Sequence, residues 1–229
     1  MELYFYSNLK EKVIRGRGED LMSLDKVIGH GNGTTVYIDG EYAIKVFDEV
    51  YDKTVVFYEA LVNSIIEKFG LPTPKVYEVL NIENKLGIKM EYIEGPTLID
   101  YMLENIENIE SYIEKMVKLQ IEIQSKDVPV LLFSLKDKLR DKIKVNSMLE
   151  NEVKERLFEI LNELPDGSEL CHGDLHGYNI LVSDEKYWVI DWIDASYGCA
   201  DGDACRTYII YLYHAPEIAE LYLLSLIHI

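Results

Sequence analysis

The chain contains the stretch Cys171-His172-Gly173-Asp174-Leu175-His176-Gly177-Tyr178-Asn179-Ile180-Leu181, followed by Val189-Ile190-Asp191-Trp192. These two segments place two carboxylates and one amide at a spacing that suits phosphoryl transfer. Asp174 can accept the proton of an attacking hydroxyl group. Asn179 and Asp191 can supply the hard oxygen ligands that magnesium prefers.

The apolar runs 179–182 and 187–190 predict two short strands around the turn 183–186. Such a hairpin would return Asp191 to the side of the loop where Asn179 lies. Taken alone, a loop Asp and Asn more often serve as helix caps or turn residues. Evidence from other parts of the sequence is therefore needed to choose between these interpretations.

A glycine-rich turn occurs upstream, in Ile28-Gly29-His30-Gly31-Asn32-Gly33-Thr34-Thr35-Val36-Tyr37. Without side chains at Gly29, Gly31 and Gly33, backbone N–H groups can approach phosphate oxygens. The alternating glycines fit neither a Walker loop nor a strict G-x-G-x-x-G, and alone they also fit a plain hairpin turn. Lys45 follows in a nearly continuous apolar strand at 42–47, where its ammonium group needs an anion.

Residues 52–69 predict a helix whose apolar stripe, at spacings of three and four, is interrupted by Glu59. A carboxylate on a packed face is costly unless it is paired, and Lys45 on the preceding strand is the expected partner. The alternative is a glutamate at the edge of the stripe that reaches solvent. The order of these elements is the order of a kinase fold.

From about residue 28 to about residue 212, the chain resembles the aminoglycoside phosphotransferase and choline kinase-like small-molecule kinases. The resemblance rests on His172-Gly173-Asp174-Leu175-His176 with Asn179 and on Ile190-Asp191-Trp192. It implies an α+β, bilobal protein kinase-like fold, with a small antiparallel-sheet lobe containing one helix and a mainly helical lobe. It also implies ATP and magnesium as cofactors.

The same resemblance implies a role for each matching residue. Asp174 is the catalytic aspartate, Asn179 and Asp191 are magnesium ligands, and Lys45 with Glu59 holds the α- and β-phosphates. His172 and Asp203 are expected to support the catalytic loop, although an ordinary N-cap role suits Asp203 equally well. Gly177 stands where many members of the family have proline.

Two features separate the chain from protein kinases. Gly173 stands where those enzymes have an arginine, and only eleven residues lie between Asp191 and the helix expected at Asp203. A long activation segment has no room here, so a small molecule with a hydroxyl group is the expected acceptor. An aminoglycoside, choline, homoserine, a sugar and an unknown metabolite all remain open as the acceptor.

We expect a nucleotide-binding lobe at 1–93 and a catalytic lobe at 94–229. The strand ending the first lobe would lead into a hinge, Met90-Glu91-Tyr92-Ile93, whose backbone groups contact adenine. Helices are predicted at 97–104, 107–125, 133–147 and 149–163, with charges such as Lys136, Lys138 and Arg140 on solvated faces.

The net charge is 23 − 41 = −18, which argues against a nucleic-acid partner and suits a cationic acceptor. Three cysteines without metal-binding spacing indicate a reducing, cytoplasmic compartment and small buried packing residues. The apolar segment 207–229 is interrupted by Pro216, Glu217 and Glu220, so no membrane span is expected. The sequence does not indicate an oligomeric state.

The final helix is predicted to run to Ile229 without a cap or polar tail. Residues 224–229 equal the translation of a transposon end used in sequencing libraries, so we expect a foreign end on a truncated chain. The alternative function is accordingly a non-catalytic nucleotide-binding module or an inactive fragment of such a kinase.

Overall fold

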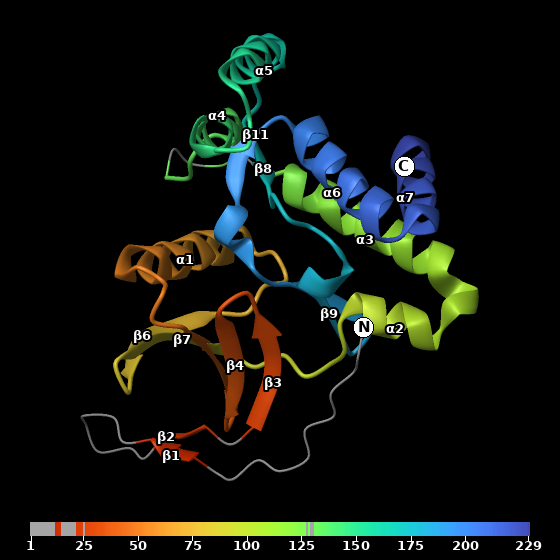
Figure 1. Ribbon diagram of the computed structural model, residues 1–229. Helices are drawn as coiled ribbons and strands as arrows, with labels where there is room; N and C mark the ends of the chain where they lie inside the picture. Colours follow the sequence, from red (N-terminus) through yellow and green to blue (C-terminus); the bar gives the residue numbers. More distant parts are fainter. Residues whose placement is uncertain (1–11, 15–21, 25, 127, 129–130) are drawn as a thin grey trace. The chain divides into compact units, whose positions relative to one another are not determined.

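The computed structural model describes residues 12–14, 22–24, 26–126, 128 and 131–229 (Figure 1). The chain forms two compact units, residues 1–94 and residues 95–229. The first holds the large sheet, and the second holds most of the helices.

The first unit is built on a five-stranded sheet with the order β3-β4-β5-β7-β6, in which all neighbours are antiparallel. The strands are β3 (Lys26–Gly31), β4 (Thr34–Asp39), β5 (Tyr42–Phe47), β6 (Val76–Ile82) and β7 (Lys85–Glu91). Helix α1 (Lys53–Ile66) follows β5 and is extended by the 3₁₀ turn η1 (Glu67–Phe69). A separate pair, β1 (Lys12–Ile14) and β2 (Met22–Leu24), precedes the sheet.

Strand β5 is buried on both faces because its alternating side chains pack into two clusters. Phe47 packs with Val56 and Ala60 of α1 on one face. Ile44 and Val46 pack with Leu24 and Ile82 on the other face. This double burial explains why the strand is apolar nearly throughout, and it leaves Lys45 on the α1 side with Phe47.

The second unit is mainly helical. Its helices are α2 (Leu98–Glu104), α3 (Ile109–Gln124), α4 (Leu135–Val145), α5 (Asn151–Glu163), α6 (Ala200–His214) and α7 (Pro216–His228), with the 3₁₀ turns η2 (Ile106–Asn108), η3 (Gly177–Asn179) and η4 (Trp192–Asp194). Four short strands form two antiparallel pairs, β8 (Glu169–Cys171) with β11 (Ser196–Gly198) and β9 (Ile180–Ser183) with β10 (Lys186–Val189). Helix α3 buries one face, and α7 contacts both α3 and α6 (Figure 1).

Several local expectations need correction. Helix α6 begins at Ala200 with Cys199 as its N-cap residue, so Asp203 lies inside the first turn and does not cap the helix. Of the three cysteines, Cys171 is buried but Cys205 is exposed, so they are not all packing residues. In the part of the chain that the structure describes, no helix is long and apolar enough to cross a membrane.

Candidate functional site

The glycine-rich turn is the tight β3–β4 hairpin of the first unit. Gly31 pairs with Thr34, and Gly33 adopts a left-handed conformation with φ of 67°. The left-handed conformation favours glycine, and a Cβ atom at Gly33 would also have to displace the Tyr51 ring, one carbon of which lies 2.7 Å from the Cβ position. The Tyr51 hydroxyl donates to the carbonyl oxygen of Asn32, which holds the tip of the turn.

Lys45 and Glu59 form a buried ion pair. The ammonium nitrogen of Lys45, on β5, donates to Glu59 Oε1 of α1 at 2.7 Å, and the side chains are only 15% and 5% exposed. Glu59 therefore does not reach solvent. Because each charge lies on a packed face, the pairing offsets part of the cost of removing both from water.

The expected hinge follows the sheet directly. Met90 and Glu91 end β7, and Tyr92 and Ile93 continue the chain. The Glu91 N–H donates to the Lys75 carbonyl at 2.8 Å and the Tyr92 N–H donates to the Glu41 carbonyl at 3.2 Å. The N–H groups of two expected hinge residues, Glu91 and Tyr92, are thus used inside the first unit.

In the second unit, residues 172–176 form the loop between β8 and η3, which carries Asp174. His172 begins this loop and is fully buried. Its Nδ1 accepts the Asp174 N–H at 3.2 Å, and its Nε2 lies 3.1 Å from the Ile190 carbonyl oxygen. Nε2 therefore carries the proton, since a carbonyl only accepts. Burial lowers the pKa of His172, with partial opposition from Asp203, so the ring is neutral.

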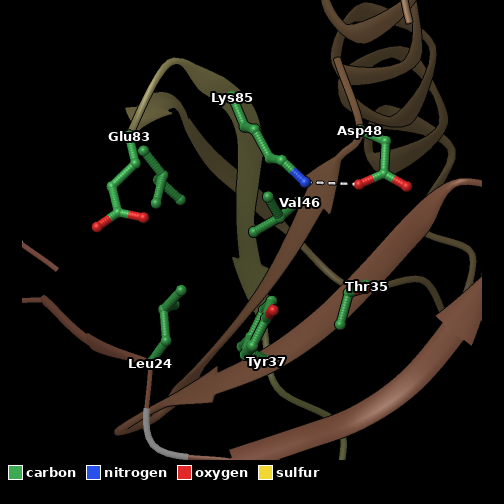
Figure 2. A pocket seen from close by; sticks show the side chains of 8 residues that line it. Leu24, Thr35, Tyr37, Val46, Asp48, Glu83 and Lys85 are labelled. Atoms are coloured by element: carbon green, nitrogen blue, oxygen red, sulfur yellow. Dashed lines mark hydrogen bonds and ion pairs between the residues drawn. The ribbon is translucent and has the colours of Figure 1, made fainter. Parts of the chain in front are cut away.

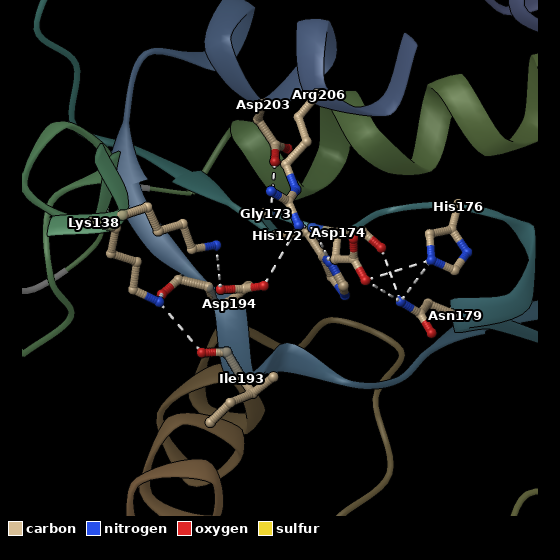
Figure 3. Close-up of polar contacts among 12 residues, drawn as sticks. Lys138, His172, Gly173, Asp174, His176, Asn179, Ile193, Asp194, Asp203 and Arg206 are labelled. Carbon is tan, nitrogen blue, oxygen red and sulfur yellow. Dashed lines mark hydrogen bonds and ion pairs between the residues drawn. The ribbon is translucent and has the colours of Figure 1, made fainter. Parts of the chain in front are cut away.

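Asp174 is held through both carboxylate oxygens (Figure 3). Oδ1 lies 3.1 Å from Arg206 Nη2, and Oδ2 lies 3.4 Å from His176 Nε2 and 3.3 Å from Asn179 Nδ2. The hydrogen bond from His176 and the charge of Arg206 lower the pKa of Asp174, against the opposing effect of burial. The carboxyl group is therefore ionised at neutral pH.

Asn179 and Asp191 are brought together by the β9–β10 hairpin. Ile180 pairs with Val189, and the Ile190 N–H donates to the Asn179 carbonyl at 3.0 Å. Asp191 then turns the chain in a left-handed conformation with φ of 63°, which aspartate tolerates better than most residues. The hairpin predicted from the sequence is thus present, although Asn179 belongs to η3 and not to the strand.

Asp203 contacts, from α6, the loop that carries Asp174. Its Oδ1 accepts the Gly173 N–H at 2.7 Å, while its Oδ2 accepts from Gln120 and Gln124 at 3.3 Å each. Gly173 has φ of 81°, and a Cβ atom there would lie 2.5 Å from the Asp194 carbonyl oxygen. The residue before Asp174 must therefore be small and left-handed, which accounts for glycine at this position.

Sequence reasoning missed four residues of this site: Lys138, His176, Asp194 and Arg206. Arg206 also lies 3.6 Å from Asp194, and Lys138 donates to the carbonyls of Ile193 and Ala195 at 3.3 and 2.9 Å (Figure 3). Burial lowers the pKa of Lys138, so the assignment of this lysine to a solvated face was wrong. A usable signal existed for Arg206, which follows Asp203 by three residues on one helical face.

A separate pocket of about 130 Å³ lies on the face of the first sheet opposite α1 (Figure 2). The Lys85–Asp48 ion pair of 2.6 Å closes one side. The residues that line it are Leu24, Thr35, Tyr37, Val46, Asp48, Ile82, Glu83 and Lys85. None of the site residues predicted from the sequence is among them.

Solved structures with this architecture include the apo form of a thermostable mutant of aminoglycoside phosphotransferase APH(4)-Ia, with a TM-score of 0.64 and 15% identity over 87% of this chain and 77% of that chain. A choline/ethanolamine kinase family protein from Mesorhizobium loti aligns with a TM-score of 0.62 and 16% identity, over 89% of this chain and 69% of that one. Amicoumacin kinase hAmiN, in complex with AMP-PNP, Ca²⁺ and Ami, aligns with a TM-score of 0.62 and 13% identity over 90% and 72% of the two chains.

At these identities the structural likeness shows the fold, which is protein kinase-like. No curated protein matches the sequence. Residues 26–219, from the start of β3 into α7, match the phosphotransferase enzyme family. Because the match covers most of the chain, the chain belongs to the phosphotransferase enzyme family.

Proposed function

We propose that the protein transfers the γ-phosphoryl group of ATP to a hydroxyl group of a small molecule in a magnesium-dependent reaction. One observation carries the proposal. Asn179 Nδ2 donates to the backbone oxygen of Asp174 at 2.9 Å and to its carboxylate at 3.3 Å. A proton acceptor and a metal-binding amide are thereby fixed in one loop, and phosphoryl transfer depends mainly on such positioning.

Asp174 acts on the acceptor. Its ionised carboxylate accepts a hydrogen bond from the acceptor hydroxyl and so orients the oxygen. As that oxygen bonds to phosphorus and the bond to ADP breaks, the hydroxyl proton passes to Asp174. A low pKa makes Asp174 a weak base, but it keeps the carboxylate ionised and able to accept a hydrogen bond. The contribution of Asp174 to the reaction is therefore mainly orientation of the acceptor hydroxyl.

The first unit supplies the contacts to the nucleotide. Backbone N–H groups of the turn at Gly29, Gly31 and Gly33 approach the phosphates. The Lys45 ammonium, aligned by Glu59, binds the α- and β-phosphates, and the backbone at Met90–Ile93 receives adenine. These assignments rest on the sequence resemblance together with the Lys45–Glu59 pair.

The residues of the second unit fit a divalent cation. Because the Asn179 amide nitrogen is engaged by Asp174, the amide oxygen is the atom available to a metal, and Asp191 adds a carboxylate. Such a small oxygen set suits magnesium, which keeps waters and shares phosphate oxygens. When bound, the metal would neutralise charge on the phosphates.

The acceptor is proposed to be a hydroxylated small molecule, and the net charge of −18 favours one that carries positive charge. One structural neighbour is a mutant of APH(4)-Ia in a ternary complex with ADP and hygromycin B. Aminoglycosides therefore come first in a test panel, followed by choline, homoserine and sugars.

The test is ATP consumption by the full chain with each acceptor, in parallel with nucleotide binding. Asp174→Asn is expected to lower turnover by about 100-fold or more while ATP binding stays nearly unchanged. Asp191→Ala is expected to weaken ATP binding only when magnesium is present. Near-parental turnover of Asp174→Asn would remove the residue from its role. If the protein binds ATP but neither phosphorylates an acceptor nor hydrolyses ATP, the result would instead favour a nucleotide-binding module.

A further inference from the structure

Arg206 joins two carboxylates that lie on different segments of the second unit. Its Nη2 atom lies 3.1 Å from Asp174 Oδ1 and 3.6 Å from Asp194 Oδ2 (Figure 3). Asp174 belongs to the loop that follows β8, whereas Asp194 ends the turn that follows β10. One guanidinium group thus connects the proton acceptor to the turn that begins at Asp191.

The backbone of α6 holds Arg206 in place. Asp203, three residues earlier on the same helical face, is 1% exposed and accepts the Gly173 N–H. The helix therefore contacts the loop twice, once at the backbone before Asp174 and once at the Asp174 side chain. The Arg206 side chain is only 39% exposed, so it works in a partly dehydrated environment where charge pairing is stronger than in water.

The contacts of Asp174 divide between its two oxygens. His176 and Asn179 approach Oδ2, and Arg206 approaches Oδ1. Without Arg206, the carboxylate would be restrained at one oxygen only and could rotate about χ2, which is a soft torsion for aspartate. The negative charge of Asp194 would also act on Asp174 without an intervening cation.

We propose that Arg206 is a positioning residue for phosphoryl transfer, which fixes the orientation of the Asp174 carboxylate by bridging it to Asp194. This inference rests on the proposed role of Asp174. Arg206 acts on the rate of transfer through Asp174 and has no part in nucleotide binding. A lysine would keep the charge but would replace the rigid, planar guanidinium group by a single ammonium group on a more flexible side chain.

The experiment compares Arg206→Gln, Arg206→Lys and Arg206→Ala with the parent. Arg156→Gln is the matched control, because it removes another arginine of the second unit whose partner is the exposed Glu159. Turnover, the KM of the acceptor, ATP affinity and the thermal midpoint are measured for each. If no acceptor in the panel is phosphorylated, slow transfer to water is the readout.

Arg206→Gln is expected to lower kcat by about 10- to 100-fold, the range for a misplaced catalytic group. ATP affinity is expected to stay at the parental value, Arg206→Lys to recover part of the rate, and Arg156→Gln to behave like the parent. Guanidinium at a non-denaturing concentration is expected to raise the turnover of Arg206→Ala, whereas urea, a neutral molecule of similar shape, is not.

Parental kcat in Arg206→Gln would overturn the inference. So would a folded Arg206→Ala whose activity neither guanidinium nor the lysine variant restores, since the loss would then be merely structural. Asp174→Asn separates this inference from the proposed function. If that variant is active, the role of Asp174 fails; if it is inactive while Arg206→Gln is fully active, only the role of Arg206 fails.

Discussion

At the scale of single residues, the loop that carries Asp174 depends on one backbone conformation. Gly173 has φ of 81°, and its N–H donates to Asp203. Any side chain there meets two separate obstacles, the unfavourable left-handed conformation and the Asp194 carbonyl oxygen 2.5 Å from the Cβ position. The placement of the next residue, Asp174, therefore depends on the absence of a side chain at Gly173.

Gly173→Ala tests this dependence. The matched control is Gly40→Ala, because Gly40 has φ of 60° but no atom within 4 Å of its Cβ position. Gly40→Ala incurs only the conformational cost, of order 1 kcal/mol. We expect Gly173→Ala to lower the free energy of unfolding by about 1–3 kcal/mol more, because the backbone must shift. Urea denaturation measures both, and equal losses would contradict the steric argument.

At the scale of elements, the start of α6 orders the loop through a buried carboxylate. Asp203 accepts hydrogen bonds from Gly173, Gln120 and Gln124. All three partners are donors, so the charged, acceptor-only side chain suits the position. Tyr222 of α7 then donates to Gln120 Oε1 at 2.6 Å, which extends the network across three helices.

Asp203→Asn is expected to destabilise the protein by about 1–3 kcal/mol, because the amide replaces one acceptor by a donor that faces other donors. Turnover is expected to fall with it, since one of the two contacts between α6 and the loop is weakened. Asp201→Asn, an exposed aspartate of the same first turn, is the control. Unfolding curves and initial rates are compared, and an Asp203→Asn protein as stable as the control would refute the network.

Helix α4 contributes a second, partly buried contact through Lys138, whose ammonium group donates to two carbonyls in the segment that follows Asp191. Lys138→Met keeps most of the length of the side chain but leaves these carbonyls without that donor. We expect turnover to fall by about tenfold through a shift of the turn. Lys136→Met, which removes a pair with the exposed Asp166, is expected to have little effect. Equal rates for the two variants would exclude a role for Lys138.

The sequence predicted the elements whose signals are local. The β9–β10 hairpin, α1 and the pairing of Lys45 with Glu59 follow from periodicity and from the cost of a buried charge. The contacts of Arg206 and Lys138 were not predicted, because they depend on how α4 and α6 pack against the loop. A pattern of charges on a helix does not distinguish a solvated lysine from one that donates to a distant carbonyl.

At the scale of the whole molecule, the net charge of −18 affects the two proposed substrates in opposite ways. At this net charge the protein is expected to repel ATP at long range, so the binding proposed for Lys45 has to overcome this repulsion. The same field attracts a cationic acceptor and raises its local concentration. Salt screens both effects, because the Debye length falls from about 30 Å at 0.01 M to about 10 Å at 0.1 M ionic strength.

Cationic and neutral acceptors are therefore expected to respond differently to ionic strength. For a cationic acceptor, kcat/KM is expected to fall by several-fold between about 0.01 and 0.15 M salt, because the attraction is screened. A neutral sugar acceptor is expected to show little change and serves as the control. The KM for ATP is expected to stay level or fall, since the screened interaction is repulsive. If cationic and neutral acceptors respond equally, the net charge does not steer the acceptor, and specificity must come from groups at the site itself.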